Sequence, residues 1–332
     1  MKSRRCAVVL TACVLLTVFS GCVLAFPAAE GRFQRALKVT GPVDLDVSTG
    51  SGSIAVRAGS SSSVEISGVI RASDDWRNNA QEKVRYLEAN PPIEQSGNTI
   101  RIGRISDPAY RNNISISYEI FVPAETRVRS NTGSGGQKIE GVRGPVDAHT
   151  GSGSVAMLDI GSDVVAQTGS GSIGLEHIAG RVDAHTGSGS IRAIDVSGPV
   201  KAETGSGGIT LSLAAAERGG AGLDVEASTG SGSIEVSGVN GSLHASTGSG
   251  GITANGIPAG DWKLVTSSGS ITLRLDADAS FDLYAHTSSG SVSTTHPITM
   301  TGTITKHELR GRVRNGGHLI EASTSSGRIT IR

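Results

Sequence analysis

The sequence predicts an all-β fold, a parallel β-solenoid whose coils contain about 18 residues. A Thr-Gly-Ser-Gly or Thr-Ser-Ser-Gly motif occurs eleven times, and the four intervals between Thr132 and Thr204 are 18 residues each. Residues around the motif alternate between apolar and polar, which is typical of half-buried strands. Only 3% of the 332 residues are aromatic, so the core must be thin and built from Val, Ile, Leu and Ala. A solenoid that stacks like residues on like residues satisfies all three observations.

The N-terminus has the pattern of an export signal. Lys2, Arg4 and Arg5 precede a mostly apolar run of 13 residues, 7–19. This run is too short to span a bilayer and is typical of the apolar region of a signal peptide.

Two cleavage sites compete in this signal. Residues 19–22, Phe-Ser-Gly-Cys, resemble a bacterial lipobox with Phe in place of the usual Leu, which would make Cys22 a lipidated N-terminus. The alternative is cleavage after Ala25. In either case Cys6 and Cys13 leave with the signal, so we expect no internal disulfide. The expected boundaries are a signal peptide over 1–21, or 1–25, and a tether over 22–35.

Each repeat contains two predicted strands, one on either side of the motif. In the copy at Thr186, Val182 and Ala184 lie four and two residues before the Thr, and Ile191 lies five residues after it. The other copies carry similar residues at the same offsets, with polar residues between them. Because side chains alternate across a strand, these apolar residues are predicted to face inward.

The second glycine of the motif is present in every copy. We expect it to adopt a positive φ, which glycine tolerates at little steric cost. We expect the motif Thr to point inward or to bond its stacked neighbour. The structural turn glycines are Gly52, Gly135, Gly153, Gly171, Gly189, Gly207, Gly232, Gly250, Gly269, Gly290 and Gly327.

An interruption follows the first copy, and residues 36–131 are predicted to form one coil with a cap. Within them, residues 73–89 read as an amphipathic helix with Ser73 as its N-cap. Residues 93–102 read as a hairpin and residues 114–122 as a strand. The apolar face of the helix comprises Trp76, Ala80, Val84 and Leu87.

The remaining residues, 132–332, are predicted to be solenoid repeats with a C-terminal cap. The interval of 37 residues between Thr287 and Thr324 is about two periods, which predicts one degenerate copy between them.

A basic cluster precedes the last repeat and is a candidate anion-binding site. It consists of Lys306, Arg310, Arg312 and Arg314. A strand would place the three alternating arginines on one face, where they could meet anionic glycans or phospholipid headgroups. The alternative, which the sequence favours, is a charged cap that blunts the end of a sheet.

Several segments resemble a bacterial family of β-strand-repeat proteins known as putative adhesins, whose domain has no assigned function. The resemblance rests on the Thr-Gly-Ser-Gly-Ser-Ile copies and on residues 117–123, Ser-Tyr-Glu-Ile-Phe-Val-Pro. It also rests on Leu-Arg-Gly at 309–311 and Asn-Gly-Gly at 315–317, before the final copy. It spans roughly residues 36–332 and implies a β-helix exposed in the cell envelope. It implies no functional residues.

Two apparent motifs for chemistry are weak. Residues 169–174 match G-x-G-x-x-G but precede no helix, so the match is a product of the repeat. Asp147, His149, Asp183 and His185 should share one outer face, near Lys201 and Glu203. Paired carboxylates serve glycoside hydrolysis, but nothing in the sequence groups three carboxylates with a basic residue and an aromatic sugar platform, so a solvated polar face is the favoured interpretation. The two histidines should lie two coils, about 10 Å, apart, too far to share a metal ion.

The sequence therefore favours a non-enzymatic cell-envelope protein, an adhesin or surface scaffold. The formal charge is 0 and the pI about 7.1, which argues against binding to nucleic acid. We expect no cofactor, an unknown envelope protein or glycan as partner, and membrane attachment only through a lipid on Cys22. The alternative is a polysaccharide lyase or hydrolase on a β-helix scaffold.

Overall fold

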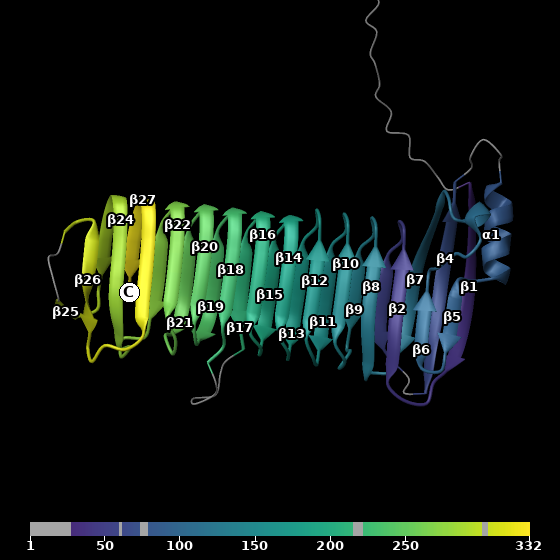
Figure 1. Ribbon diagram of the computed structural model, residues 1–332, viewed down its shortest axis with the longest axis horizontal. Coiled ribbons are helices and arrows are strands. Elements are labelled where there is room, and N and C mark those ends of the chain that lie inside the picture. Colours follow the sequence, from purple (N-terminus) through teal and green to yellow (C-terminus); the bar gives the residue numbers. More distant parts are fainter. Residues whose placement is uncertain (1–27, 60–61, 74–78, 215–221, 301–304) are drawn as a thin grey trace, which may run out of the picture.

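The computed structural model describes residues 28–59, 62–73, 79–214, 222–300 and 305–332. Within them, 27 strands, the α-helix α1 and one 3-10 helix, η1, form a long β-solenoid (Figure 1). The all-β solenoid expected from the sequence is confirmed. The predicted export signal, Cys22 and Trp76 lie outside the described residues.

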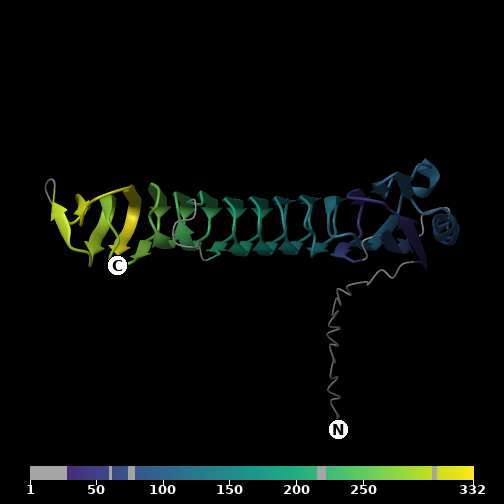
Figure 2. The same ribbon diagram turned by 90° about the horizontal axis from the view of Figure 1, so that it is seen from below.

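The strands form two rows, one before and one after the motif turn of each coil. The first row contains, in pairing order, β6 (Thr99–Ile102), β2 (Val43–Thr49), β8 (Thr126–Thr132), β10 (Val146–Thr150), β12 (Val164–Thr168), β14 (Val182–Ser188), β16 (Val200–Ser206), β18 (Val225–Ser231), β20 (Leu243–Ser249) and β22 (Trp262–Ser268). The second row contains β7 (Ile114–Val122), β3 (Ile54–Ala58), β9 (Gln137–Glu140), β11 (Val155–Ile160), β13 (Ile173–Ile178), β15 (Ile191–Val196), β17 (Ile209–Leu213), β19 (Ile234–Asn240), β21 (Ile252–Ile257) and β23 (Ile271–Leu275). In Figure 2 the coils follow one another along the long axis.

Neighbouring coils pair in parallel and stack like residues on like residues. Val164 pairs with Val182, and Thr168 with Thr186. The inward Val, Ala and Ile columns are almost completely buried. Burial of each large aliphatic side chain stabilises the fold by about 1.5–3 kcal/mol, so the core gains a similar amount in every coil. Trp262 replaces a valine in its column, and its Nε1 donates to Gly241 O at 2.9 Å.

The motif turns are held by contacts between coils. In ten of the eleven copies the motif Thr is buried, and its hydroxyl donates to the carbonyl of the motif's second glycine in the neighbouring coil, as from Thr204 to Gly189 at 2.8 Å. In the first copy Thr49 donates instead to Ile116 O at 2.8 Å. The expectation that this Thr bonds its stacked neighbour is confirmed.

The expected positive φ does not explain the second glycine. Only five of the eleven motif glycines have a positive φ, between 148° and 158°, and Gly189 is not one of them. At all eleven positions, however, an added Cβ would lie 1.8–2.2 Å from a backbone oxygen of the neighbouring coil. Close approach of two backbones therefore requires the glycine. The positions with positive φ are Gly207, Gly232, Gly250, Gly269 and Gly327.

An antiparallel cap closes the N-terminal end. Strand β1 (Ala29–Lys38) pairs with β4 (Ser63–Ala72), and β4 pairs with β7. Because β1 begins at Ala29, ordered structure starts inside the stretch expected to be a tether. The predicted hairpin is present as β5 (Ile93–Ser96) and β6, and the strand predicted over 114–122 is β7.

The helix of the cap is shorter than predicted. Helix α1 spans Ala80–Ala89 and follows Asn79, so the prediction of Ser73 as its N-cap is wrong. Ser73 instead donates its backbone N–H to Asn113 O, which continues the strand ladder of β4. The short η1 (Pro108–Tyr110) follows the hairpin.

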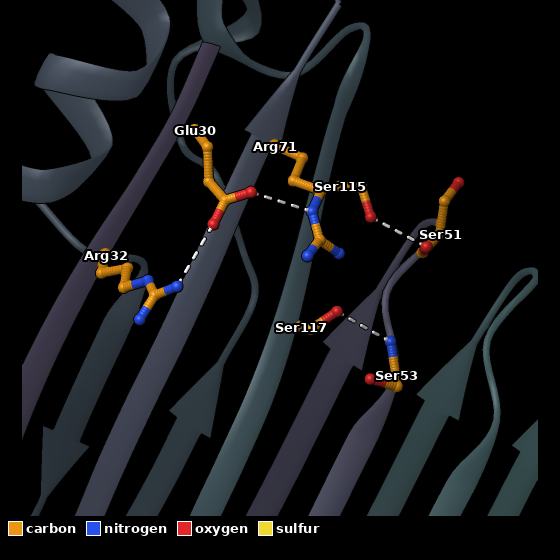
Figure 3. A network of polar contacts seen from close by, with 7 residues as sticks. All are labelled: Glu30, Arg32, Ser51, Ser53, Arg71, Ser115 and Ser117. Carbon is orange, nitrogen blue, oxygen red and sulfur yellow. Dashed lines mark hydrogen bonds and ion pairs between the residues drawn. The ribbon is translucent and has the colours of Figure 1, made fainter. Parts of the chain in front are cut away.

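Polar contacts join the outer face of this cap to the first coil (Figure 3). Glu30 on β1 accepts from Arg71 on β4 at 3.3 Å and from Arg32 at 3.5 Å. Ser115 on β7 donates to Ser51 O in the first motif turn at 2.8 Å. The cap is thereby fixed to the solenoid on its solvent side as well as through the core.

The C-terminal strand is inserted between two earlier coils. Strand β27 (Leu319–Ile331) pairs in parallel with β22 and β23 on one side and with β24 (Phe281–Thr294) on the other, so Thr324 contacts both Thr266 and Thr287. Figure 1 shows β27 in yellow between β22 and β24.

The prediction of a degenerate repeat between Thr287 and Thr324 is wrong. The residues described there form β25 (Ile298–Met300) and β26 (Glu308–Val313). Strand β26 runs antiparallel to β24 and covers its outer edge, and β25 pairs with β26. The described residues between the two motifs thus build an end cap and lead back to the inserted strand rather than forming another coil.

Candidate functional site

A polar column runs along the outside of the first row and continues onto the C-terminal cap. We call its outward surface the charged face. It is formed by residues that stack in register from coil to coil, because each lies three residues before a motif Thr or pairs with such a residue. These residues are Asp183, Lys201, Glu226, His244, Lys263, Glu321, Tyr284 and Arg310.

The first half of the charged face contains a groove of about 390 Å³. Asp183, Lys201, Glu226, His244 and Lys263 line it in successive coils, so acidic and basic side chains lie close together along the groove. Lys201 contacts Glu203 at 3.1 Å, and this hydrogen bond, together with the charges of Glu203 and Glu226, raises the pKa of Lys201. Asp224, Asp261 and Arg181 complete the charged lining.

The two expected pairs, Asp147 with His149 and Asp183 with His185, lie on the outer side of the first row as predicted. The two pairs do not contact each other, because β12 lies between their strands. Asp147 and His149 form a contact of 2.6 Å on β10. His185 lies 3.6 Å from Glu203, and Gln167 on β12 separates it from His149 in the stack. Among the described residues no group of three or more His, Cys, Asp or Glu side chains could hold a metal ion.

The second half of the charged face contains a larger hollow, of about 650 Å³. Its wall includes Tyr284, which pairs with Glu321 on β27 and with Arg310 on β26. Asp282 contacts Arg312 at 3.3 Å, whereas Arg310 has no ion pair within the described part of the chain. An aromatic ring therefore stands between an uncompensated guanidinium and a carboxylate.

Only part of the basic cluster reaches this hollow. Arg310 and Arg312 both face outward from β26, as the alternation predicted. Arg314 lies beyond the strand in a left-handed conformation, φ 54°, and its guanidinium donates to Ala277 O at 2.9 Å. Lys306 is exposed in the loop before β26. The prediction that the three alternating arginines share one face is therefore wrong for Arg314, because the strand ends before it, and Lys306 also lies outside the hollow.

Tyr284 was missed by reasoning from the sequence, although its signal was present. It lies three residues before Thr287, at the same offset as Asp183 from Thr186. Alignment on the motif Thr would have placed an aromatic ring on the polar column.

The C-terminal third of the sequence matches a known family model. Residues 224–332 match the family model Toastrack DUF4097. The Toastrack match covers about a third of the chain, including the second half of the charged face, and confirms the family resemblance expected from the sequence. The comparison with curated proteins finds no match.

Two solved structures also align with most of the chain. A "putative cell adhesion protein" from Clostridium sporogenes is 11% identical, with a TM-score of 0.22, and the alignment covers 91% of this chain and 99% of that one. A "putative adhesin" from Bacteroides fragilis is 12% identical, with a TM-score of 0.33, over 91% and 97% of the two chains. In the described residues no helix is both long enough and apolar enough to cross a membrane.

Proposed function

We propose that this chain is a non-enzymatic, exported cell-envelope protein that binds an anionic glycan through its charged face. The solenoid is the scaffold, and the hollow around Tyr284 is the centre of binding. One observation carries the proposal: Tyr284 stands between Arg310 and Glu321 in a hollow of about 650 Å³ on a paired sheet.

The residue types in this hollow suit an acidic sugar. An aromatic ring offers a flat apolar surface for the carbon face of a sugar, and its hydroxyl offers a polar edge. The planar fork of a guanidinium matches a carboxylate, and Arg310 forms no ion pair with any carboxylate of the described residues. Glu321 can accept hydrogen bonds from sugar hydroxyls.

The scaffold proposal rests on the stacking of the coils. Each coil contacts only its neighbours, so the charged residues repeat at a spacing of about 4.8 Å along a stiff axis. A linear polymer that follows this axis would meet the groove near Lys201 and then the hollow near Tyr284. We further propose that the export signal ends before Cys22 and that a lipid on Cys22 anchors residues 29–332 to the envelope.

The binding proposal can be tested with immobilised polysaccharides. We expect the mature protein to be retained on a uronate-rich polysaccharide more than on a neutral one, and less as salt rises. Tyr284→Ala and Arg310→Gln should each weaken retention about tenfold or more, since each removes one of the two main contacts. The matched control is Arg192→Gln on β15, an exposed arginine of the second row. Equal retention of all four proteins would refute the proposal.

A second candidate has one observation in its favour. Asp183, Asp224, Glu226 and Asp261 converge on the groove of about 390 Å³ beside Lys201. Paired carboxylates and a basic residue could cleave a polysaccharide. The same polysaccharides, incubated with the protein, distinguish the two: release of new reducing ends, abolished by Glu226→Gln, would establish an enzyme in place of a binding protein.

A further inference from the structure

A cavity in the N-terminal cap lies apart from the charged face. It has a volume of about 410 Å³ and lies where the end of β2, the loop after β6 and the start of β7 meet. Ile105, Ile114 and Ile116 form its apolar wall, and Arg104 and Arg111 contribute guanidinium groups. This volume falls in the range of pockets that hold small molecules.

The hydroxyl of Tyr118, which lines this cavity, has no hydrogen-bond partner among the described residues. Tyr118 is 2% exposed, and its hydroxyl is buried without any hydrogen-bond partner. Burial also raises the pKa of this phenol, so the group remains a protonated donor. A buried donor left unpaired costs about 1–3 kcal/mol. The residue is held by its ring, which packs edge-on against Phe33 at 6.3 Å between ring centres.

The two arginines are available to an anion. Arg104 has no hydrogen bond or ion pair within the described residues and is exposed. Arg111 donates from Nε and Nη2 to Ile105 O, at 3.3 and 3.0 Å, which fixes the loop and leaves its charge uncompensated by any described carboxylate. Two positive groups therefore line a cavity that also has an apolar wall of three isoleucines.

We propose that this cavity binds a small anionic amphiphile, an oxygen acid with an apolar chain or ring. The apolar part would lie against Ile105, Ile114 and Ile116. The acid group would be paired with Arg104 and Arg111, and one of its oxygens would accept the hydrogen bond of Tyr118. This site is independent of the glycan proposed for the charged face.

The cavity also has a route for a longer ligand. It shares Ser48, Thr49, Gly50 and Gly103 with a shallow groove of about 660 Å³ along the first coils. That groove has glycines on its floor and the polar side chains of Asn131, His149 and Gln167 beside them. A polar extension of the amphiphile would continue into it.

Octanoate and octyl phosphate are the probes, with octylammonium as the cationic control. Binding to the mature chain is measured by calorimetry. We expect both anions to bind and the ammonium not to bind; preference between them separates a free fatty acid from a phosphate-bearing lipid as the source. Tyr118→Phe should weaken binding of the preferred anion about 2- to 10-fold, the loss of one hydrogen bond. Arg104→Gln should weaken it by more, because a charged partner is lost.

Two comparisons keep the test decisive. Arg101→Gln, on the exposed face of β6 and outside the cavity, should leave affinity unchanged. Tyr118→Phe should fold at least as stably as the unaltered chain in the absence of probe, since it removes an unpaired donor. Absence of binding by both anions, equal binding of octylammonium, or unchanged affinity in Tyr118→Phe would each overturn the proposal.

Discussion

Substitution of a single turn glycine should open the stack of coils. In Gly189→Ala the new Cβ would lie 2.1 Å from Gly171 O and 2.6 Å from Gly171 C, both backbone atoms of the preceding coil. An ordinary carbon–oxygen contact is about 3.3–3.6 Å, so the two turns must separate by more than about 1 Å. No side chain can rotate away to relieve the contact.

The loss of stability in Gly189→Ala can be estimated from the steric overlap and from the hydrogen bond that breaks when the two turns separate. Ser188 N donates to Gly169 O at 3.1 Å beside the clash, and a shift of about 1 Å breaks this bond. Overpacking costs about 1–3 kcal/mol, and each hydrogen bond lost adds about 1 kcal/mol. We therefore expect Gly189→Ala to lower the free energy of unfolding by about 2–4 kcal/mol.

The chain offers a matched control in the same region. Gly174 on β13 has no atom within 4 Å of its added Cβ and no positive φ. Gly174→Ala should raise stability by about 0.4–1 kcal/mol, because alanine restricts the unfolded chain. Urea unfolding followed by circular dichroism measures both variants, and hydrogen exchange at the turns of neighbouring coils locates the damage. Equal stability of the two variants would refute the close-approach argument.

A third variant separates contact from backbone conformation. Gly207 has φ 148°, unlike Gly189, but its added Cβ would meet Gly189 O at a similar 2.2 Å. If close approach decides, Gly207→Ala and Gly189→Ala should cost similar amounts. A much larger loss of stability in Gly207→Ala than in Gly189→Ala would show that the positive φ, and not the close approach of the backbones, is the main reason for glycine at these positions.

Four further changes follow from the same structure. Thr204→Val keeps the shape of the side chain but loses the hydrogen bond to Gly189 O, and should lower stability by about 1 kcal/mol in urea unfolding. Removal of residues 181–198 deletes one 18-residue coil and lets Val164 stack on Val200; scattering should show a folded protein about 4.8 Å shorter, whereas aggregation would contradict independent coils. Removal of residues 319–332 deletes the inserted strand, and rapid proteolysis between 276 and 318 should follow because β24 loses its inner partner. Burial holds the pKa of Tyr118 above its value of about 10 in the unfolded chain, so above pH 10 only the unfolded chain releases this proton and stability falls; Tyr118→Phe should flatten that fall in alkaline unfolding curves.

The sequence predicts the repeated part of the fold because local and global signals coincide there. Val182, Ala184 and Ile191 recur at fixed offsets from Thr186, and parallel stacking of identical coils is the arrangement that buries all of these columns. The sequence leaves open whether Thr186 points inward or bonds a neighbour. In the structure it does both, since it is buried and its hydroxyl donates to Gly171 O at 2.8 Å.

The cause of the turn glycine could not be read from one coil. A positive φ is a property of a single residue, so a glycine that recurs at the same position of each repeat suggests it. The contact that excludes a side chain at Gly189 is made by the carbonyl of Gly171, 18 residues earlier, and appears only when two coils are stacked.

The candidate site was predictable to the extent that it belongs to the repeat. Asp183 reaches the polar column by its offset from Thr186, and His185 lies two residues later on the same outer side of β14, as expected. Tyr284 and Arg310 become neighbours because β26 turns back antiparallel to β24, and an interval of 37 residues does not reveal whether a chain continues a coil or reverses. The hollow that supports the proposed function is thus made by the part of the chain that departs from the repeat.

The inserted strand explains why this departure lies at the C-terminal end. A solenoid that simply stopped would expose the unpaired edge of its last coil, which is a template for association with other chains. Here β26 covers the outer edge of β24, and β27 occupies the place that would otherwise bring β22 and β24 together. Because Thr324 is in register with both Thr266 and Thr287, the insertion keeps the inward columns of the first row continuous, with Ile320 between Trp262 and Leu283 and Ala322 between Leu264 and Ala285. The same rearrangement sets Leu319 and Glu321 beside Tyr284, so the closure of the sheet and the formation of the hollow are one structural event.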